Sequence, residues 1–419
     1  MDKLIIFGGK PLRGEVKVSG AKNSALPIMA ASLLTEEDCL IKNVPHLSDV
    51  YTMAKILTAL GKEVKFESDR LLIRHRRSQS FVAPYRLVRT MRASFCVLGP
   101  LLAGRHKAKV SLPGGCVIGL RPVDLHLKGL EALGAEIKIS GGYCWAKAAE
   151  LRGREIFLGG DFGSSVLATA NIMMASTLAK GRTVIDFSAC EPEIVDLAKV
   201  LKKMGAKIRG EGTPRIVVEG TKSLGGFEHK IISDRIEAGT FAVFALVSGG
   251  RIKLQGAEPA HLLAVFDALT KIGASIRIKD TEVSVSGRRV KPLNITTFPY
   301  PGFPTDLQAQ FMVLLSLAKG ISVITEKVYP DRFMHVAELN RMGARIQRFG
   351  PLAVIEGIKR FSPAEVMASD LRASAALVAA GLNAVGKTVI HRVYHLYRGY
   401  ENLQQKLEKL GAQIKREDE

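Results

Sequence analysis

The stretch PEIVDLAKVLKKMGAKI, residues 192–208, combines the features that decide the fold of this 419-residue chain. Its apolar residues recur at the spacing that forms one face of an amphipathic helix. They are Ile194, Leu197, Val200, Leu201 and Met204. Gly205 follows, and glycine tolerates the positive φ that ends a helix. The alternating apolar residues after it predict a strand, so the stretch indicates a helix-to-strand corner.

The same corner occurs six times along the chain, as LGKEV, LGAEI, MGAKI, IGASI, MGARI and LGAQI. Their glycines are Gly61, Gly134, Gly205, Gly273, Gly343 and Gly411. Successive glycines are 73, 71, 68, 70 and 68 residues apart, so the period is close to 70. Six evenly spaced copies indicate an internal repeat of one α/β module.

A second helix precedes each corner, and it is rich in small residues, as in TANIMMASTLAKG. Such a helix is apolar on nearly all sides, which predicts full burial, and a strand-like run such as TVIDF follows it. The period exceeds that of common solenoids, so we expect compact domains of three modules each. Residues 21–230 are expected to form the first domain, with 1–20 plus 231–419 as the second. That division assumes, from symmetry, that the N-terminal strand LIIF completes the last module's sheet.

Composition excludes several classes of protein. The excess of 60 Lys and Arg over 40 Asp and Glu, a net charge of +20, favours anionic partners, but a basic solvated surface explains it equally well. The four apolar residues before Gly8 are too few for a signal peptide, and no apolar run approaches the roughly 18 residues that span a bilayer. Five cysteines without a CxxC pair argue against a disulfide framework and a zinc site. We expect a soluble cytoplasmic protein that does not bind membranes.

One cysteine differs from the others in its setting. Cys116 lies in SLPGGCVIGLRPVDLH, between glycines that suit a mobile loop. Arg121 and the loop amides are expected to lower the pKa of this thiol toward the range in which it transfers protons. A free cysteine is more often a small core residue. That role is assigned to Cys39, Cys96, Cys144 and Cys190.

Several basic residues stand where buried helices are expected to begin. Lys22 and Asn23 open such a helix in SGAKNSALP, and Arg92, Arg372 and Arg398 occur in RTMRAS, SDLRAS and LYRGYE. A solvated lysine is the ordinary alternative for Lys22. Anions prefer helix N-termini, and guanidinium groups bind carboxylate and phosphate through two hydrogen bonds. The set therefore predicts a site for a small acid with several negative charges.

Asp306, in FPTDLQAQF, again precedes an apolar helix. The plain interpretation is a helix cap. If Asp306 also faces the arginines, a carboxylate near bound anions is expected to have a raised pKa and to act as a general base. The two roles are compatible.

In their order along the chain, the motifs resemble the UDP-N-acetylglucosamine 1-carboxyvinyltransferases of the enolpyruvyl transferase family. The resemblance runs from SGAKNSALP through RGYENLQQKLEKLGA, nearly the whole chain. The motifs that carry it are GAKN, TMRAS, PGGCVIGLRPVDLH, EPEIVDLA, DRIEAGTF, FPTDLQAQF, RFMHV, DLRASA and RGYE. It implies an α/β fold of two inside-out α/β barrel domains, each of three repeated modules, the enolpyruvyl transferase fold.

The resemblance also implies the reaction. The enolpyruvyl group of phosphoenolpyruvate would pass to the 3-hydroxyl of UDP-N-acetylglucosamine with release of phosphate, the first committed step of peptidoglycan precursor synthesis. Asp306 would receive the hydroxyl proton, Cys116 would protonate C3 and would also promote product release, and Lys22 would complete the catalytic set. The other implied substrate-binding residues are Asn23, Arg92, Arg121, Val328, Arg372 and Arg398. No metal or cofactor is required, and a monomer is expected.

Two positions depart from the family pattern, and two rival functions remain. Leu167 stands where the family commonly has glycine near the nucleotide, and Pro330 replaces a more usual acidic residue near the uridine. One rival is the sister activity, 5-enolpyruvylshikimate-3-phosphate synthase. The other is a nucleic-acid-binding protein, suggested by charge alone, although no nucleic acid is expected because aromatic residues do not alternate with the basic ones.

Overall fold

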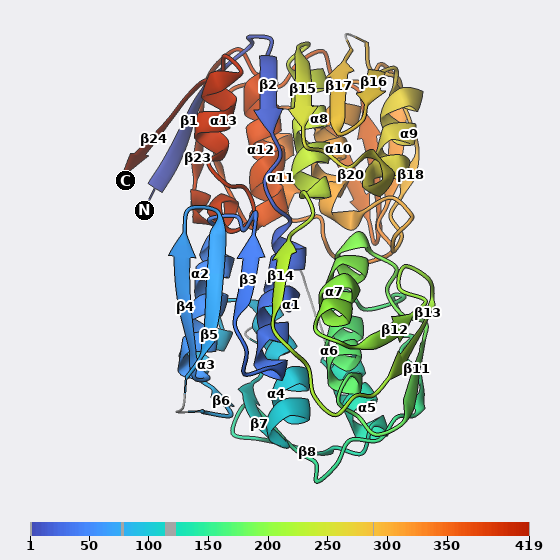
Figure 1. The fold of residues 1–419 in the computed structure, drawn as a ribbon. Coiled ribbons are helices and arrows are strands. Elements are labelled where there is room, and N and C mark those ends of the chain that lie inside the picture. Colours follow the sequence, from blue (N-terminus) through green and yellow to red (C-terminus); the bar gives the residue numbers. More distant parts are fainter. Residues whose placement is uncertain (1, 77–78, 114–122, 288, 419) are drawn as a thin grey trace. The chain divides into compact units, whose positions relative to one another are not determined.

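The computed structural model describes residues 2–76, 79–113, 123–287 and 289–418, which divide into two compact units (Figure 1). Within these residues, the N-unit comprises 20–232. The C-unit comprises 2–19 together with 233–418. The two units are described separately below.

Each module of the N-unit contains a buried helix, a strand, an amphipathic helix and two hairpin strands. The buried helices are α1 (Lys22–Ala31), α4 (Leu98–Arg105) and α6 (Val166–Ser176), and the strands after them are β3 (Cys39–Lys42), β7 (Lys107–Ser111) and β11 (Arg182–Asp186). The amphipathic helices are α2 (Ser48–Ala59), α5 (Asp124–Ala132) and α7 (Pro192–Lys203). The hairpin strands are β4 (Lys62–Glu67), β5 (Arg70–His75), β8 (Glu136–Ser140), β9 (Tyr143–Lys147), β12 (Lys207–Arg209) and β13 (Arg215–Glu219). Edge strands and short helices are β6 (Val82–Ala83), β10 (Glu155–Phe157), β14 (Phe227–Lys230), η1 (Ser32–Leu34), α3 (Tyr85–Val88) and η2 (Arg92–Val97).

The C-unit repeats this plan. Its buried helices are α8 (Arg235–Val247), α10 (Gln308–Leu315) and α12 (Leu371–Asn383), followed by β15 (Arg251–Gln255), β19 (Ile321–Thr325) and β23 (Gly386–His391). The amphipathic helices are α9 (Leu263–Ile272), α11 (His335–Arg341) and α13 (Leu403–Lys409). The next strands are β16 (Ser275–Lys279), β17 (Glu282–Ser286), β20 (Arg345–Phe349), β21 (Leu352–Glu356) and β24 (Gln413–Asp418). The remaining elements are β1 (Asp2–Gly8), β2 (Arg13–Lys17), β18 (Ile295–Thr296), β22 (Glu365–Met367), η3 (Pro259–Leu262), η4 (Thr305–Leu307) and η5 (Val393–Arg398).

Every module in the described chain forms a four-stranded sheet with the same pattern of parallel and antiparallel pairs. In β6-β7-β9-β8, for example, β6 and β7 are parallel and the other pairs antiparallel. Strands distant in sequence complete some of these sheets. β14 pairs with β3 of the first module, and β2 pairs with β15 of the fourth. β1 lies between β23 and β24 in the last sheet, with Leu4 opposite Ile390 and Arg416. The two strands at the N-terminus therefore belong to different sheets.

The repeated corner is confirmed in all six modules. The φ angles at the repeat glycines are 91°, 96°, 106°, 106°, 87° and 93°. At the end of α7, the Gly205 amide donates to Lys202 and the Ala206 amide to Leu201, which satisfies carbonyl groups that a helix end leaves free. A Cβ at Gly205 would meet nothing within 4 Å, so the backbone angle alone requires glycine there.

The small-residue helices lie inside each unit, with the sheets around them (Figure 1), which confirms the inside-out α/β fold. Close approach explains the small residues, because a Cβ at Gly99 of α4 would lie 2.3 Å from the Asn171 carbonyl oxygen of α6. Cys39, Cys96 and Cys144 are buried as predicted, whereas Cys190 is partly exposed, so its core assignment is corrected. Among the described residues, no helix is long and apolar enough to cross a bilayer.

Candidate active site

Asp306 lies in η4 of the C-unit, held between two arginines. Its carboxylate accepts hydrogen bonds from Arg332 at 2.8 Å and from Arg372, in the first turn of α12, at 3.1 Å. The arginine side chains are 6% and 5% exposed and that of Asp306 is 27% exposed. Of the predicted residues, the structure therefore brings Asp306 and Arg372 together.

Two expectations for Asp306 are wrong. The residue caps no helix: neither η4 nor α10 has a side-chain cap, because both carboxylate oxygens face the arginines. Its pKa is lowered, not raised. Burial opposes ionisation, but the positive charges of Arg372 and Arg332 outweigh burial and hold the pKa well below its ordinary value. Asp306 is thus ionised at neutral pH.

Arg372 is held on its other side by a buried aromatic residue. Its guanidinium lies 5.4 Å from the centre of the Tyr400 ring, and the Tyr400 hydroxyl contacts Thr240 and Gln310 at 3.0 Å. Nη1 of Arg372 is buried and has no hydrogen-bond partner within the described chain. This donor keeps unused hydrogen-bonding capacity.

Lys22 is the first residue of α1 in the N-unit. Ala21 provides no side-chain cap there. The ammonium of Lys22 pairs with Asp49 of α2 at 3.0 Å, and the two side chains are 11% and 7% exposed. Asn23 follows in the first turn and is partly exposed. The N-terminus of α1 therefore carries a fixed cation, as the sequence predicted.

Arg92 and Arg398 begin and end short helices. Arg92 opens η2 in the N-unit, next to the buried His126, whose pKa is lowered to about 3 by burial and then by the charge of Arg92. Arg398 closes η5 in the C-unit and is followed by Gly399, so the prediction that it starts a helix is wrong. The physical reason is that the chain turns at Gly399 before α13 begins.

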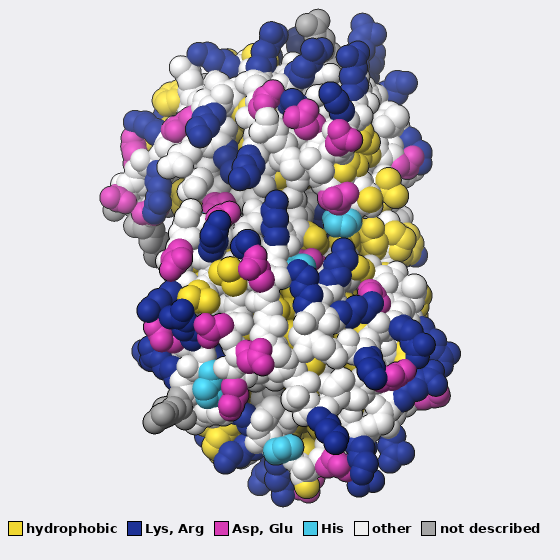
Figure 2. Space-filling view, viewed as in Figure 1, with side chains coloured by type: hydrophobic (Ala, Val, Ile, Leu, Met, Phe, Trp, Pro, Cys, Tyr) yellow, Lys and Arg dark blue, Asp and Glu magenta, His cyan; other side chains and the backbone are white. Residues whose placement is uncertain are grey.

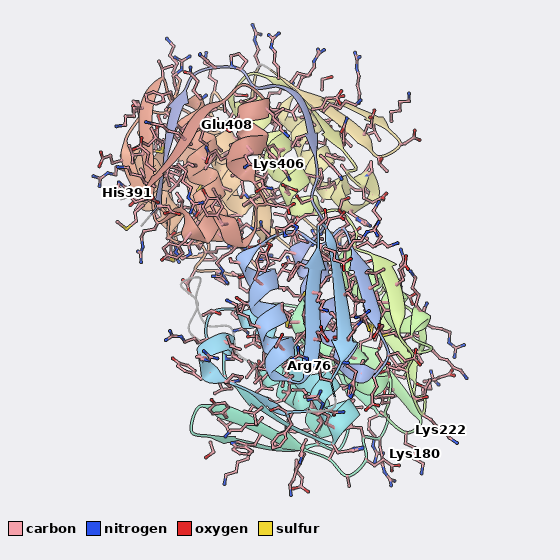
Figure 3. All side chains as sticks on the ribbon, turned by 60° about the vertical axis from the view of Figure 1, so that its left-hand side comes forward. Arg76, Lys180, Lys222, His391, Lys406 and Glu408 are labelled. Atoms are coloured by element: carbon pink, nitrogen blue, oxygen red, sulfur yellow. The ribbon has the colours of Figure 1, made fainter. Side chains whose placement is uncertain are left out.

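The segment after Arg398 is anchored by a partly buried ionic network in the C-unit. Ser19 donates its hydroxyl to Glu401 at 2.6 Å and its amide to Glu237, also at 2.6 Å. Lys406, on α13 (Figure 3), donates to Ser19 and Glu237. Burial raises the pKa of Glu237, and Lys406 opposes that shift. The network fixes the RGYE segment to the start of α8.

The remaining predicted residues are less informative. Cys116 and Arg121 lie outside the described residues. Val328 is partly buried in the turn after β19, beside Pro330. Leu167 lies in the first turn of α6 and packs against the core of the N-unit.

The sequence interpretation missed Arg332, Asp49 and Tyr400 as neighbours of the predicted residues. Arg332 stands in RFMHV and Tyr400 in RGYE, two motifs that were recognised without assigning these side chains. Asp49 is 27 residues from Lys22, and nothing in the sequence pairs them. Within the described residues, no group of three His, Cys, Asp or Glu side chains is arranged to hold a metal ion.

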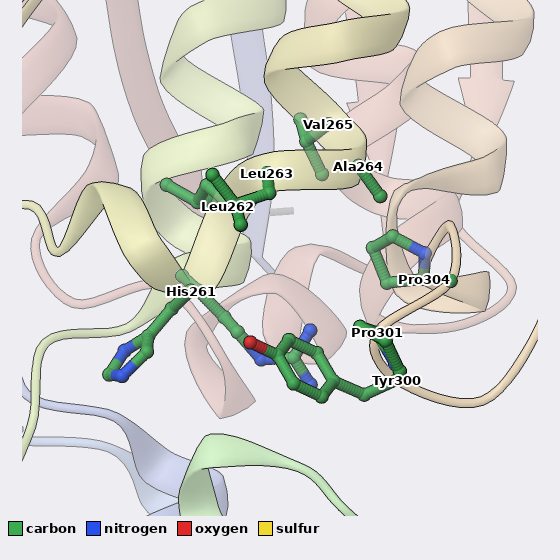
Figure 4. Close-up of a pocket in the computed structure, with 10 residues that line it drawn as sticks. His261, Leu262, Leu263, Ala264, Val265, Tyr300, Pro301 and Pro304 are labelled. Carbon is green, nitrogen blue, oxygen red and sulfur yellow. The ribbon is translucent and has the colours of Figure 1, made fainter.

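A separate pocket in the C-unit is lined by η3, the start of α9 and the turn before η4 (Figure 4). Tyr300 donates its hydroxyl to the Ala260 carbonyl at 3.3 Å, and Arg235 lies over its ring. Pro304, which precedes η4, borders the pocket, but Asp306 does not line it. Its lining carries none of the predicted residues, so the pocket does not define the site.

Lys and Arg side chains are spread over the surface, with Asp and Glu between them, on the face that Figure 2 shows. Nucleic-acid interfaces instead gather basic residues in a patch or stripe. The visible face therefore offers no support for the nucleic-acid rival.

Comparison with known proteins defines the class. Residues 6–407 match the family described as EPSP synthase (3-phosphoshikimate 1-carboxyvinyltransferase). The chain is 52% identical over 417 residues to UDP-N-acetylglucosamine 1-carboxyvinyltransferase of Methylacidiphilum infernorum and 50% identical over 417 residues to that of Desulfosudis oleivorans, covering 99% of each chain.

Solved structures agree on the fold. The enolpyruvyl transferase NikO from Streptomyces tendae superposes with a TM-score of 0.90 at 24% identity, covering 99% of this chain and 98% of that one. EPSP synthase from Acinetobacter baumannii gives 0.76 at 18% identity over the whole of both chains. The fold is therefore that of the enolpyruvyl transferases. The chain belongs to this family, the EPSP synthase family.

Proposed function

We propose that this protein transfers the enolpyruvyl group of phosphoenolpyruvate to the 3-hydroxyl of UDP-N-acetylglucosamine and releases phosphate. The observation that carries the proposal is the identity of 50–52% over 99% of the chain with relatives that bear the name of this activity. The reaction belongs to peptidoglycan precursor synthesis. Both substrates are intracellular metabolites, so we place the protein in the cytoplasm. We also propose that it is a monomer.

Asp306 is proposed to accept the proton of the sugar hydroxyl. Its lowered pKa keeps it ionised, so it can accept a hydrogen bond from the hydroxyl before reaction. A carboxylate with a low pKa is a weak base toward a neutral alcohol. Proton transfer is therefore expected to accompany C–O bond formation, when the attacking oxygen gains positive charge and its proton becomes acidic.

The basic residues are proposed to bind the carboxylate and phosphate of phosphoenolpyruvate. Lys22 and Arg398 would act with Arg121, and Arg92 and Arg372 would add positive charge as negative charge develops on the substrate. The unused Nη1 donor of Arg372 supports such a role. Cys116 would protonate C3 or promote product release. Asn23 and Val328 would contact the nucleotide sugar.

Phosphate release tests the proposal. The purified chain is given phosphoenolpyruvate with either UDP-N-acetylglucosamine or shikimate-3-phosphate, and inorganic phosphate is measured. We expect turnover with the nucleotide sugar alone. Turnover with shikimate-3-phosphate would favour the sister activity named in the family description. An absence of phosphate release with UDP-N-acetylglucosamine would overturn the proposal.

A further inference from the structure

A buried carboxylate that no predicted role includes lies beside the Asp306 cluster. Glu326 follows β19 in the C-unit and is 0% exposed. No Lys or Arg side chain donates a hydrogen bond to it among those described. A buried charge without a cation is costly unless hydrogen bonds fully satisfy it. The partners of Glu326 therefore explain why it is tolerated.

Four donors converge on this carboxylate. Oε1 accepts from the Thr297 hydroxyl at 2.6 Å and from the amides of Val328 and Tyr329, both at 2.9 Å. Oε2 accepts from the Thr305 hydroxyl at 2.9 Å. A carboxylate offers about four acceptor sites, and four donors meet this one, three at Oε1 and one at Oε2. The two amides belong to the turn that contains Val328, and Glu326 thus holds that turn in place.

Thr305 connects Glu326 to the proposed base. Arg332 donates through one nitrogen, Nη1, to the Thr305 hydroxyl oxygen at 3.1 Å and to Asp306 at 2.8 Å. A guanidinium has no acceptor, so Thr305 must accept from Arg332 and has one proton left to donate. That proton goes to Glu326. The donor directions from Arg332 through Thr305 to Glu326 are therefore fixed.

We propose that Glu326 is a positioning residue for the reaction: through the Thr305 hydroxyl it fixes Arg332, and through Arg332 it fixes the Asp306 carboxylate. The same carboxylate holds the Val328 turn. This inference rests on the proposed function, because it assigns a catalytic use to the geometry of Asp306.

The chain contains a matched control for a merely structural role. Thr297 is buried and donates to Glu326 as Thr305 does, and its hydroxyl accepts from the Lys327 amide at 3.0 Å. It has no hydrogen bond to Arg332 or Asp306 in the described structure. Removal of either hydroxyl costs the Glu326 carboxylate one donor. Only removal of the Thr305 hydroxyl interrupts the path to Asp306.

The test uses T305V, T305S, E326Q, the double variant T305V/E326Q, and T297V. In E326Q the amide oxygen can keep the three donors at Oε1, while its NH2 group faces Thr305 and takes away the acceptor of the Thr305 proton. Misplacement of a catalytic group costs up to about a hundredfold in rate, and we expect T305V and E326Q each to lower kcat about tenfold. T305S keeps the hydroxyl and should stay within about twofold of wild type.

The measurements are kcat and KM for UDP-N-acetylglucosamine from phosphate release, with melting temperature recorded for every variant. T305V/E326Q should lose about as much as either single variant, because both interrupt one path. T297V should keep kcat within about twofold even where its melting temperature falls as far as that of T305V.

The inference is overturned if T297V and T305V lose equal kcat, or if the losses of T305V and E326Q multiply in the double variant. Either result leaves the proposed function intact as long as the wild-type enzyme turns over. A wild-type enzyme inactive with UDP-N-acetylglucosamine would overturn both.

Discussion

The second modules of the two units bury a histidine at the same repeat position. His126 lies eight residues before Gly134, at α5, and His335 eight residues before Gly343, at α11. The two residues are 3% and 2% exposed. The common spacing shows that the module fixes which position of the amphipathic helix faces the interior.

The surroundings of the two histidines differ. His126 lies 2.9 Å from the Asn171 side-chain nitrogen, and its ring is nearly perpendicular to that of Phe95. Asn171 donates to that ring nitrogen, so the imidazole accepts there and is neutral. His335 lies beside the charges of Asp370 and Arg332, and its Nε2 is buried with no hydrogen-bond partner within the described chain. His126 is thus a neutral packed residue near Arg92, whereas His335 adjoins the ionic cluster of Asp306.

The largest effect on a single variant is expected from removing the negative charge of Asp306, which the second module of the N-unit lacks. Asp306→Asn leaves Arg332 and Arg372 buried without their shared counterion, which should lower the free energy of unfolding by about 3 kcal/mol. Loss of the proposed base should lower kcat at least about a hundredfold. Phosphate release and urea unfolding measure the two effects.

Asp267→Asn is the matched control for that prediction. Asp267 pairs with Lys271 on the surface of α9, where both side chains are about 60% exposed. Such a pair contributes about 0.5 kcal/mol or less, so this variant should keep its activity and stability. Similar behaviour of the two variants would show that the Asp306 cluster is an ordinary surface pair.

The second prediction concerns acid, and it tests the buried histidine that the two modules share. Burial and the charge of Arg92 lower the pKa of His126 to about 3. Burial lowers the pKa of His335 to about 4; the charge of Asp370 opposes this shift and that of Arg332 adds to it. Each of these two histidines takes up a proton below about pH 6.5 in the unfolded chain, whereas in the native chain it stays neutral. Stability is therefore full above that pH and falls as the pH drops toward 4, by about 1.4 kcal/mol per pH unit for each histidine.

Urea unfolding of wild type, H126Q and H335Q between pH 7 and 4.5 separates the two contributions. Each substitution should remove about one histidine's share of the slope. Asp306 does not contribute in this window, since its lowered pKa makes its stabilisation disappear only below about pH 4. An unchanged slope in either variant would mean that its histidine is protonated in the native protein.

The sequence predicted the corners because their signals are local. A repeated glycine and apolar periodicity act within a few residues, and both specify a helix end. The surroundings of Asp306 were not predictable in this way. Arg332 and Arg372 lie 26 and 66 residues away, and their charges reverse the expected direction of the pKa shift. The same limit explains why Asp49 was missed, since its partner Lys22 is on another helix.

The smallest effect on the free energy of unfolding is expected at the glycine corners of the same two modules. Gly134 and Gly343 have φ angles of 96° and 87°, so alanine at either position is strained and should cost about 1 kcal/mol. A Cβ at Gly134 would lie 3.8 Å from the nearest atom, whereas at Gly343 it would lie 3.4 Å from the Ser362 hydroxyl oxygen. Both distances are ordinary van der Waals contacts, so G343A and G134A should cost about the same in urea unfolding.

Ser362→Ala shows whether any measured difference comes from the contact with Ser362. In the S362A background, G343A and G134A should cost the same, because only the backbone strain remains. If G343A stays more costly there, the difference lies in the corner itself and not in its neighbour. The two modules would then differ in backbone geometry as well as in the partners of their buried histidines, and the repeat would constrain less of the structure than its regular glycine spacing indicates.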